Sequence, residues 1–250
     1  MLMVTKKSTA TKKTTVKKST KAVAKAPEKK EKKFTFDLTP LAIYLLPQFA
    51  VAFAAVFILG DSFSEHANTI GSISLILAAI IMLIVYRKRI AEDAKRLKKS
   101  KPGIGFAIGM ALLVLLVNFI ATTVIGAIFG SVSENQSTLE SGFASTLVIT
   151  LLMTVFSAPV NEEFVFRAML GKIFKNDIVF YIISALTFAI IHTGFNLFTI
   201  SVIPYALVGL GFAFIFRKTG DNIVASILAH FINNLAAVAM VIIPLLAGGQ

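Results

Sequence analysis

Two adjacent glutamates and an arginine lie within a largely apolar stretch of the chain, at Glu162, Glu163 and Arg167. Glu163 and Arg167 are four residues apart, so they share a helix face and can form an ion pair. Glu162 points about 100° away from Glu163 on a helix of 3.6 residues per turn and has no local partner. It is therefore the candidate general acid or base. An internal salt bridge that joins two helices is the competing interpretation.

Three further polar side chains, His192, His230 and Asn234, interrupt other apolar stretches. An ionisable group at membrane depth costs about 2.5–3.5 kcal/mol, so each one is a candidate functional residue. Along helices, Glu162, His192 and His230 lie roughly 13, 21 and 10 Å from the predicted cytoplasmic ends of their spans, and Asn234 roughly 16 Å. The sequence therefore predicts one polar cluster at a common depth.

A carboxylate, two imidazoles and an amide can activate water and stabilise an oxyanion, which is what peptide hydrolysis without a covalent nucleophile requires. The same groups could instead relay protons. Glu162, His192 and His230 could also hold Zn²⁺ or another divalent metal, although the His-Glu-x-x-His spacing of soluble zinc proteases is absent. The chain has no cysteine, which excludes a thiol nucleophile and thiolate ligands.

Membrane helices must position these residues, because the chain is too apolar for a soluble domain. Its 250 residues are 56% hydrophobic and 15% charged, with a mean hydropathy of +0.81. A hydrocarbon core about 30 Å thick needs about 20 apolar residues per helix. We therefore predict an all-α, polytopic membrane bundle of about seven transmembrane helices. The predicted spans are 39–60, 69–86, 102–130, 145–170, 178–196, 199–217 and 223–246.

The basic residues predict how the bundle is oriented. Lys and Arg cluster in residues 1–33 and 87–101, with pairs at 172–175 and 217–218. Cytoplasmic loops carry an excess of Lys and Arg, and all these segments fall on one side of a seven-span chain. We predict a cytoplasmic N-terminus and an extracytoplasmic C-terminus.

The domain organisation follows from the same composition. Residues 1–35 are predicted to be a disordered, Lys-rich cytoplasmic tail, because they contain too few apolar groups to offset the entropy of ordering. The tail could attract anionic lipid. No nucleic-acid partner is expected, because no aromatic side chains interleave with the lysines. Residues 36–250 are predicted to form the transmembrane domain.

Smaller patterns concern packing and helix ends. Pro159, just before the glutamates, is expected to kink or restart its helix. Gly105-x-x-x-Gly109 and Gly126-x-x-x-Gly130 are expected to permit close helix approach. Asn176-Asp177 and Asp221-Asn222 are expected to cap the helices that follow them.

Three ordered motifs resemble those of the CPBP family of intramembrane proteases, which includes CAAX proteases and bacteriocin-processing enzymes and is also called Abi. They are Glu-Glu-x-x-x-Arg at 162–167, Phe-x-x-x-His at 188–192 and His-x-x-x-Asn at 230–234. The resemblance covers roughly residues 145–240, which it identifies as the catalytic core. The low core charge, the absence of Trp and the short loops are similar to bacterial members, which implies a bacterial plasma membrane.

The resemblance implies a role for each matching residue. Glu162 would activate the attacking water with help from His192, and His230 and Asn234 would stabilise the oxyanion. Glu163 and Arg167 would support the site, and Phe188 would shape the pocket. The family is described both as metalloproteases and as metal-free glutamate proteases; the Asn at 234 favours the metal-free version.

The resemblance also implies a peptide or protein substrate, reached from the cytoplasmic leaflet. Prenylated proteins, bacteriocin immunity and peptide maturation all occur in the family. Two other classes of function share these residues: a non-catalytic immunity or scaffolding protein, and a proton-coupled transporter.

Overall fold

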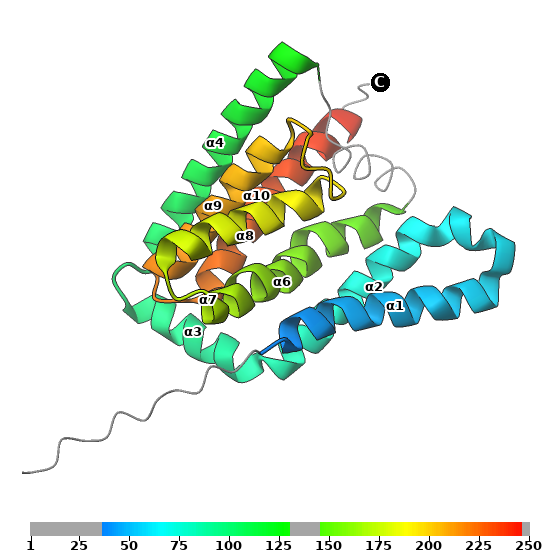
Figure 1. Ribbon diagram of the computed structural model, residues 1–250, viewed down its shortest axis with the longest axis horizontal. Helices are drawn as coiled ribbons and strands as arrows, with labels where there is room; N and C mark the ends of the chain where they lie inside the picture. The colour runs from blue at the N-terminus through cyan, green and yellow to red at the C-terminus, as the bar shows by residue number, and fades with distance from the viewer. Residues whose placement is uncertain (1–36, 131–145, 247–250) are drawn as a thin grey trace, which may run out of the picture. The chain divides into compact units, whose positions relative to one another are not determined.

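The computed structural model describes residues 37–130 and 146–246, which are helical almost throughout (Figure 1). One long helical stretch, Thr146–Ile173, includes two π-helical segments. The elements are α1 (Thr39–Leu59), η1 (Gly60–Ser62), α2 (Phe63–Val85), α3 (Arg87–Lys99), α4 (Ile104–Phe129), η2 (Leu152–Ser157), α6 (Ala158–Glu163), η3 (Phe164–Met169), α7 (Leu170–Ile173), α8 (Asp177–His192), α9 (Val202–Lys218) and α10 (Ile223–Leu246). The described ranges contain no strand, so the all-α prediction is confirmed.

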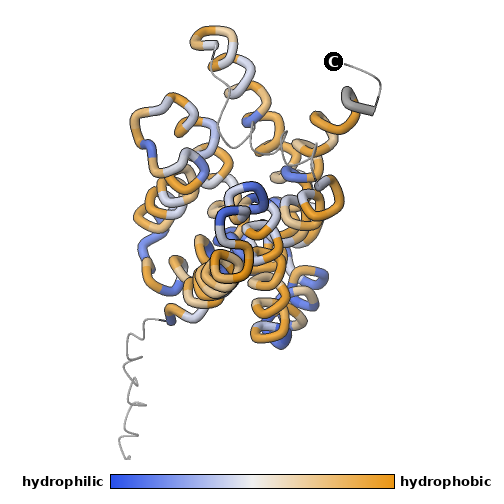
Figure 2. The backbone as a smooth tube through the Cα atoms, turned by 90° about the vertical axis from the view of Figure 1, so that its right-hand side faces the viewer, coloured by the Kyte–Doolittle hydropathy of each residue, from blue (hydrophilic) through white to orange (hydrophobic). Residues whose placement is uncertain are grey.

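Within residues 37–130 and 146–246, four helical stretches are long and apolar enough to cross a membrane: Thr39–Val85, Ile104–Phe129, Thr146–Ile173 and Ile223–Ile243. The first contains α1 and α2, which pack side by side, and Asp177–His192 is a shorter apolar helix. Hydrophobic residues cover most of the helices (Figure 2). The chain is an integral membrane protein. Its predicted N-terminal tail, residues 1–35, lies outside the described residues.

The helices pack in an order that brings the polar motifs together. α9 lies between α8 and α4, and α10 packs against α4 and α9 (Figure 1). The long helix that contains α6 packs against α2 on one side and α10 on the other. The long helix, α8 and α10, which carry the predicted site residues, therefore meet in the interior.

Close approach between helices occurs at different glycines from those predicted. A Cβ at Gly105, Gly109, Gly126 or Gly130 would meet nothing within 4 Å among the described residues, so that expectation was wrong. Tight positions on α9 are Gly209, where a Cβ would lie 3.1 Å from the Ala185 Cα of α8, and Gly211, where a Cβ would overlap the Val114 side chain of α4. Repeated glycine spacing indicates small residues but not the face they occupy, and α4 turns these glycines away from its neighbours.

Asparagine caps begin α8 and α10, as predicted. The Asn176 Oδ1 accepts a hydrogen bond from the Val179 amide at 3.1 Å, and the Asn222 Oδ1 accepts one from the Ala225 amide at 3.1 Å. Each oxygen satisfies an amide that has no partner within its own helix.

The start of α10 is also held by Asp93 of α3, a contact that the sequence did not predict. The Ile223 amide donates to Asp93 Oδ2 at 2.9 Å, and the Asn222 side chain donates to the Asp93 carbonyl at 2.8 Å. Asp93 is buried, and its negative charge lies at the positive end of the α10 dipole.

Replacing Asp93 with Ala is expected to lower the free energy of unfolding by about 1–2 kcal/mol, as loss of a helix cap does. Glu92 is its exposed neighbour on α3, and Glu92→Ala is the matched control, with an expected effect within about 0.5 kcal/mol. Unfolding in detergent measures both variants. Equal losses in the two would show that the contact with Ile223 adds no stability.

Candidate active site

The two glutamates lie on α6, a short α-helical segment between the π-helical segments η2 and η3. The π geometry begins before Pro159: the Ala158 amide donates to the Met153 carbonyl, five residues back. The next such bond would need an amide hydrogen from Pro159, which has none, so the Thr154 carbonyl is left free. The expected helix irregularity therefore takes the form of π segments, which are frequent at functional sites.

Glu163, Arg167 and His230 form a fully buried charged cluster. Arg167 Nη1 lies 3.0 Å from Glu163 Oε1, and both side chains are 0% exposed. His230 Nδ1 of α10 lies 2.9 Å from the same carboxylate oxygen. Arg167 Nη2 also donates to the Gly209 carbonyl at 3.0 Å. The predicted pair of Glu163 and Arg167 is therefore present, and it joins the long helix to α9 and α10.

Glu162 faces both histidines. Its Oε2 lies 3.6 Å from His192 Nε2 and 3.9 Å from His230 Nε2. The side chains of Glu162 and His192 are 13% and 15% exposed, and that of His230 is 2% exposed. Among the described residues, Glu162 Oε2 has no hydrogen-bond partner. The sequence predicted that Glu162, His192 and His230 lie at one depth in the membrane. The structure brings the two imidazoles to the same carboxylate oxygen.

The hydrogen bonds of the two imidazoles define which nitrogen faces Glu162. His192 Nδ1 lies 2.8 Å from the Phe188 carbonyl, which can only accept, so the hydrogen is on Nδ1. His230 Nδ1 likewise donates to the Glu163 carboxylate. When it is neutral, each ring then presents an Nε2 lone pair toward Glu162. Because lone pairs and a carboxylate repel one another, a proton, a water molecule or a cation has to bridge them.

Aromatic side chains hold both imidazole rings in place. Phe188 stacks on His192 with ring centroids 4.2 Å apart, and Tyr205 stacks on the same imidazole at 4.9 Å. Phe212 stacks on His230 at 4.7 Å. The Arg167 guanidinium lies 4.8 Å from the Phe188 ring centroid, within reach of a cation–π interaction. These contacts restrict ring rotation, so the Nε2 atoms keep their direction.

Asn234 contacts a different part of the long helix. Its Nδ2 donates at 2.8 Å to the Thr154 carbonyl, the acceptor that Pro159 leaves free. Asn233 Nδ2 lies 3.4 Å from the Asn234 Oδ1. The amide of Asn234 keeps a second hydrogen available, so its predicted oxyanion contact stays a prediction.

Glu162, His192 and His230 are chemically suited to bind a divalent metal, but their donor atoms are not close enough together to coordinate one. Metal-bound histidines usually donate their other ring N–H to a carbonyl or carboxylate, as His192 and His230 do. The unpartnered Glu162 Oε2 would be the third ligand. Among residues 37–130 and 146–246, however, no three His, Asp or Glu side chains lie close enough to form a metal site. A metal would have to draw these three residues together.

Two contributors to the site escaped the sequence prediction. Tyr44 of α1 lies close enough to Glu162 to interact with its charge. Asn161, which is fully buried, donates to the Leu75 carbonyl at 2.8 Å and so joins α6 to α2. Treating every polar side chain at membrane depth as a candidate would have found Asn161, because it is an amide directly beside the glutamates. Tyr44 carried no such signal, because a tyrosine near a helix end is common in membrane proteins.

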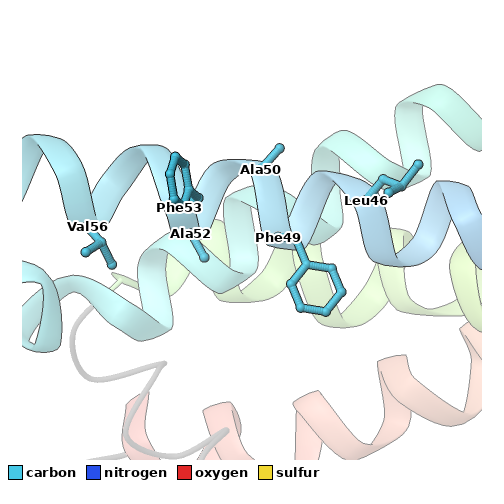
Figure 3. Close-up of a pocket in the computed structure, with 6 residues that line it drawn as sticks. All are labelled: Leu46, Phe49, Ala50, Ala52, Phe53 and Val56. Atoms are coloured by element: carbon cyan, nitrogen blue, oxygen red, sulfur yellow. The ribbon is translucent and has the colours of Figure 1, made fainter.

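Two pockets of the structure lie away from these residues. An apolar pocket of about 620 Å³ runs along α1, lined by Leu46, Phe49, Ala50, Ala52, Phe53 and Val56 (Figure 3). A second pocket of about 270 Å³ lies between α1 and α2. Neither of the two includes Glu162, His192 or His230. The side chains of Glu162 and His192 are nevertheless 13% and 15% exposed.

Comparison with known families gives this cluster its context. Residues 143–236 match the family described as type II CAAX prenyl endopeptidase Rce1-like. This region is similar to the CPBP family. All six predicted site residues lie inside the matched region: Glu162, Glu163, Arg167, His192, His230 and Asn234. At the family level, the match supports an intramembrane endopeptidase.

Curated relatives are similar over shorter stretches. The UPF0177 protein in the abiGi 5′ region of Lactococcus lactis subsp. cremoris is 38% identical over 89 residues, which is 36% of each chain. The UPF0177 protein YajF of Lactococcus lactis subsp. lactis (strain IL1403) is 33% identical over 69 residues, 28% of this chain and 33% of the relative. The chain thus spans about a third of the length of these relatives. No solved structure matches it.

Proposed function

We propose that the chain is an intramembrane endopeptidase in which Glu162 activates the water that attacks the peptide bond. One observation carries the proposal: a buried carboxylate oxygen, Glu162 Oε2, lies 3.6 Å from His192 Nε2 and 3.9 Å from His230 Nε2, in two oriented imidazoles. A water molecule that bridges these atoms could donate to Glu162 and to an imidazole. Such a water would be both held and made more nucleophilic.

Proton transfers would follow the geometry. Glu162 takes a proton from the water as its oxygen bonds to the carbonyl carbon, and the carbonyl oxygen becomes an oxyanion. The same proton then passes to the amide nitrogen as the C–N bond breaks. His230 can donate to the oxyanion from Nε2 only as an imidazolium, and the Glu163 carboxylate at its Nδ1 stabilises that form. The free hydrogen of the Asn234 amide is the second proposed donor.

The side from which the substrate arrives is part of the proposal. Glu162 lies ten residues before Lys172, so it is roughly 15 Å along the helix from that basic end. Arg217 lies at the same end, where it donates to the Gly171 and Phe174 carbonyls. If basic residues mark the cytoplasmic side, a membrane peptide or protein approaches from the cytoplasmic leaflet.

The test compares chains that differ at one atom. Cells that express the wild type or Glu162→Gln are grown in parallel, and new peptide termini in their membrane fractions are identified by mass spectrometry. A protease predicts termini that appear only with the wild type, at sites that the purified protein also cuts in liposomes. Identical termini in both would contradict the proposal and would favour an immunity, scaffolding or transport role.

Chelation tests the metal-free version of the mechanism. A bound divalent metal, held by Glu162, His192 and His230, would polarise the water or the substrate carbonyl. Because Asn234 is engaged with the Thr154 carbonyl and is a weak ligand, we predict that purified protein keeps its cleavage rate in excess EDTA or phenanthroline. Loss of cleavage that Zn²⁺ restores would contradict this version and assign the three residues as ligands.

A further inference from the structure

A line of small polar side chains runs along one face of the long helix, away from the glutamates and toward Thr146. Its members are Thr150, Thr154, Ser157 and Asn161, spaced by four, three and four residues. They are 4%, 5%, 5% and 0% exposed. The opposite face is apolar, and its exposed residues include Val148, Leu152 and Phe156. The helix thus has a buried polar stripe and an exposed apolar side.

The stripe faces the seam between α2 and α10. Asn161 donates to the Leu75 carbonyl of α2, and the Thr154 carbonyl accepts from Asn234 of α10. Asn233, 8% exposed, adds another buried amide beside the seam. The polar side chains therefore lie between three membrane helices.

Hydrogen bonds within and between the helices satisfy only some of the polar atoms of the stripe. Ser157 Oγ donates to the Leu152 carbonyl, and the Nδ2 groups of Asn161 and Asn234 are also satisfied. Along the stripe and at the residues next to it, the atoms left over are oxygens: in the described part of the chain, Thr154 Oγ1, Asn161 Oδ1, Asn233 Oδ1 and Glu162 Oε2 are buried with no hydrogen-bond partner, whereas the unpartnered nitrogens belong to Arg167 and Arg217. Unpartnered polar groups are costly in a membrane. Oxygens in such a row need a mobile donor that carries several hydrogens, which water provides.

We propose that the stripe Thr150–Asn161 and the facing Asn233 line a hydrated path that leads to Glu162 from the end of the helix opposite Lys172. Water would reach the carboxylate along this path while the substrate approaches from the other end. The use of this water in hydrolysis rests on the proposed function. The path itself does not, because it can be measured without any substrate.

The absence of native cysteine makes the path measurable with silver ion, a thiol-binding cation that travels in water. Ser157→Cys and Thr150→Cys introduce thiols on the stripe with little change in size. Leu152→Cys and Phe156→Cys introduce them at similar depth on the apolar face and are the matched controls. Membranes are treated with silver for varied times, then denatured, and the thiols that remain are labelled with a fluorescent maleimide.

The two stripe thiols are expected to be blocked by silver at least about tenfold faster than the two controls, because the reactive thiolate forms in water and not in lipid. Equal rates at the four positions would overturn the proposal. So would full maleimide labelling at positions 150 and 157 after silver treatment. Maleimide labelling of untreated, denatured samples confirms that each thiol is present, and gel filtration confirms that each variant is folded.

A second variant tests the direction of the path. Thr154→Val has nearly the same shape but removes the hydroxyl between positions 150 and 157. Added to Ser157→Cys, it is expected to slow the silver reaction at position 157 and, added to Thr150→Cys, to leave position 150 unchanged. If position 157 reacts as fast as before, the water comes from the end of the helix near Lys172 and the proposed path is wrong.

Discussion

Glu162→Gln is expected to lower the rate of peptide cleavage by about 10²–10⁴-fold, the contribution of a general base. The amide keeps the shape of the carboxylate but cannot accept the proton of the attacking water. The buried cluster of Glu163, Arg167 and His230 is untouched by this change, so the free energy of unfolding should stay close to that of the wild type. The measurement is the initial rate of cleavage in liposomes at saturating substrate.

The control for this prediction is Glu65→Gln, the same substitution at an exposed position of α2. It should cleave at the wild-type rate. If Glu162→Gln also cleaves at that rate, the carboxylate is not the base, and the residues around it hold the helices together without taking part in chemistry.

Arg167→Met is expected to lower the free energy of unfolding by about 3–5 kcal/mol, because it leaves a buried carboxylate without its cation. Glu163 is 0% exposed and would keep only the His230 imidazole as a hydrogen-bond partner from another helix. The double variant Glu163→Gln with Arg167→Met should recover part of the loss, since no unpaired charge then remains. Reversible unfolding in mixed detergents, analysed as a double-mutant cycle, gives the interaction energy.

Lys172→Met is the matched control, because Lys172 pairs with Asp37 at 2.7 Å but their side chains are 48% and 30% exposed. An exposed pair of this kind contributes about 0–1 kcal/mol. Similar losses from Lys172→Met and Arg167→Met would show that burial adds nothing to the ion pair between Glu163 and Arg167.

Much of the fold and the centre of the site could be predicted from the sequence. Runs of apolar residues between charged segments correspond to the observed helices, because lipid permits few other structures. Counting residues from the predicted helix ends brought Glu162, His192 and His230 to one depth, and the structure brings these three residues together. The helical spacing of Glu163 and Arg167 likewise predicted their ion pair.

The contacts between helices could not be predicted in this way, because depth does not determine how a helix is rotated. Glu163 pairs with His230 as well as with Arg167, and Asn234 binds the Thr154 carbonyl. The π segments η2 and η3 flank α6, and such segments alter the helical spacing on which a sequence prediction relies. The glycines of α4 failed as packing signals for the same reason, since their spacing does not define which face meets a neighbour.

The most direct test of water activation by Glu162 is a single turnover in water enriched in ¹⁸O. The enzyme is in excess over an intact peptide that it is known to cleave. Direct attack by water predicts one ¹⁸O atom in the new carboxyl terminus in the first turnover of the wild type, and almost no product with Glu162→Gln. A first-turnover product without ¹⁸O would instead indicate that the Glu162 carboxylate supplies the oxygen. That result, or normal cleavage by Glu162→Gln, would contradict the account.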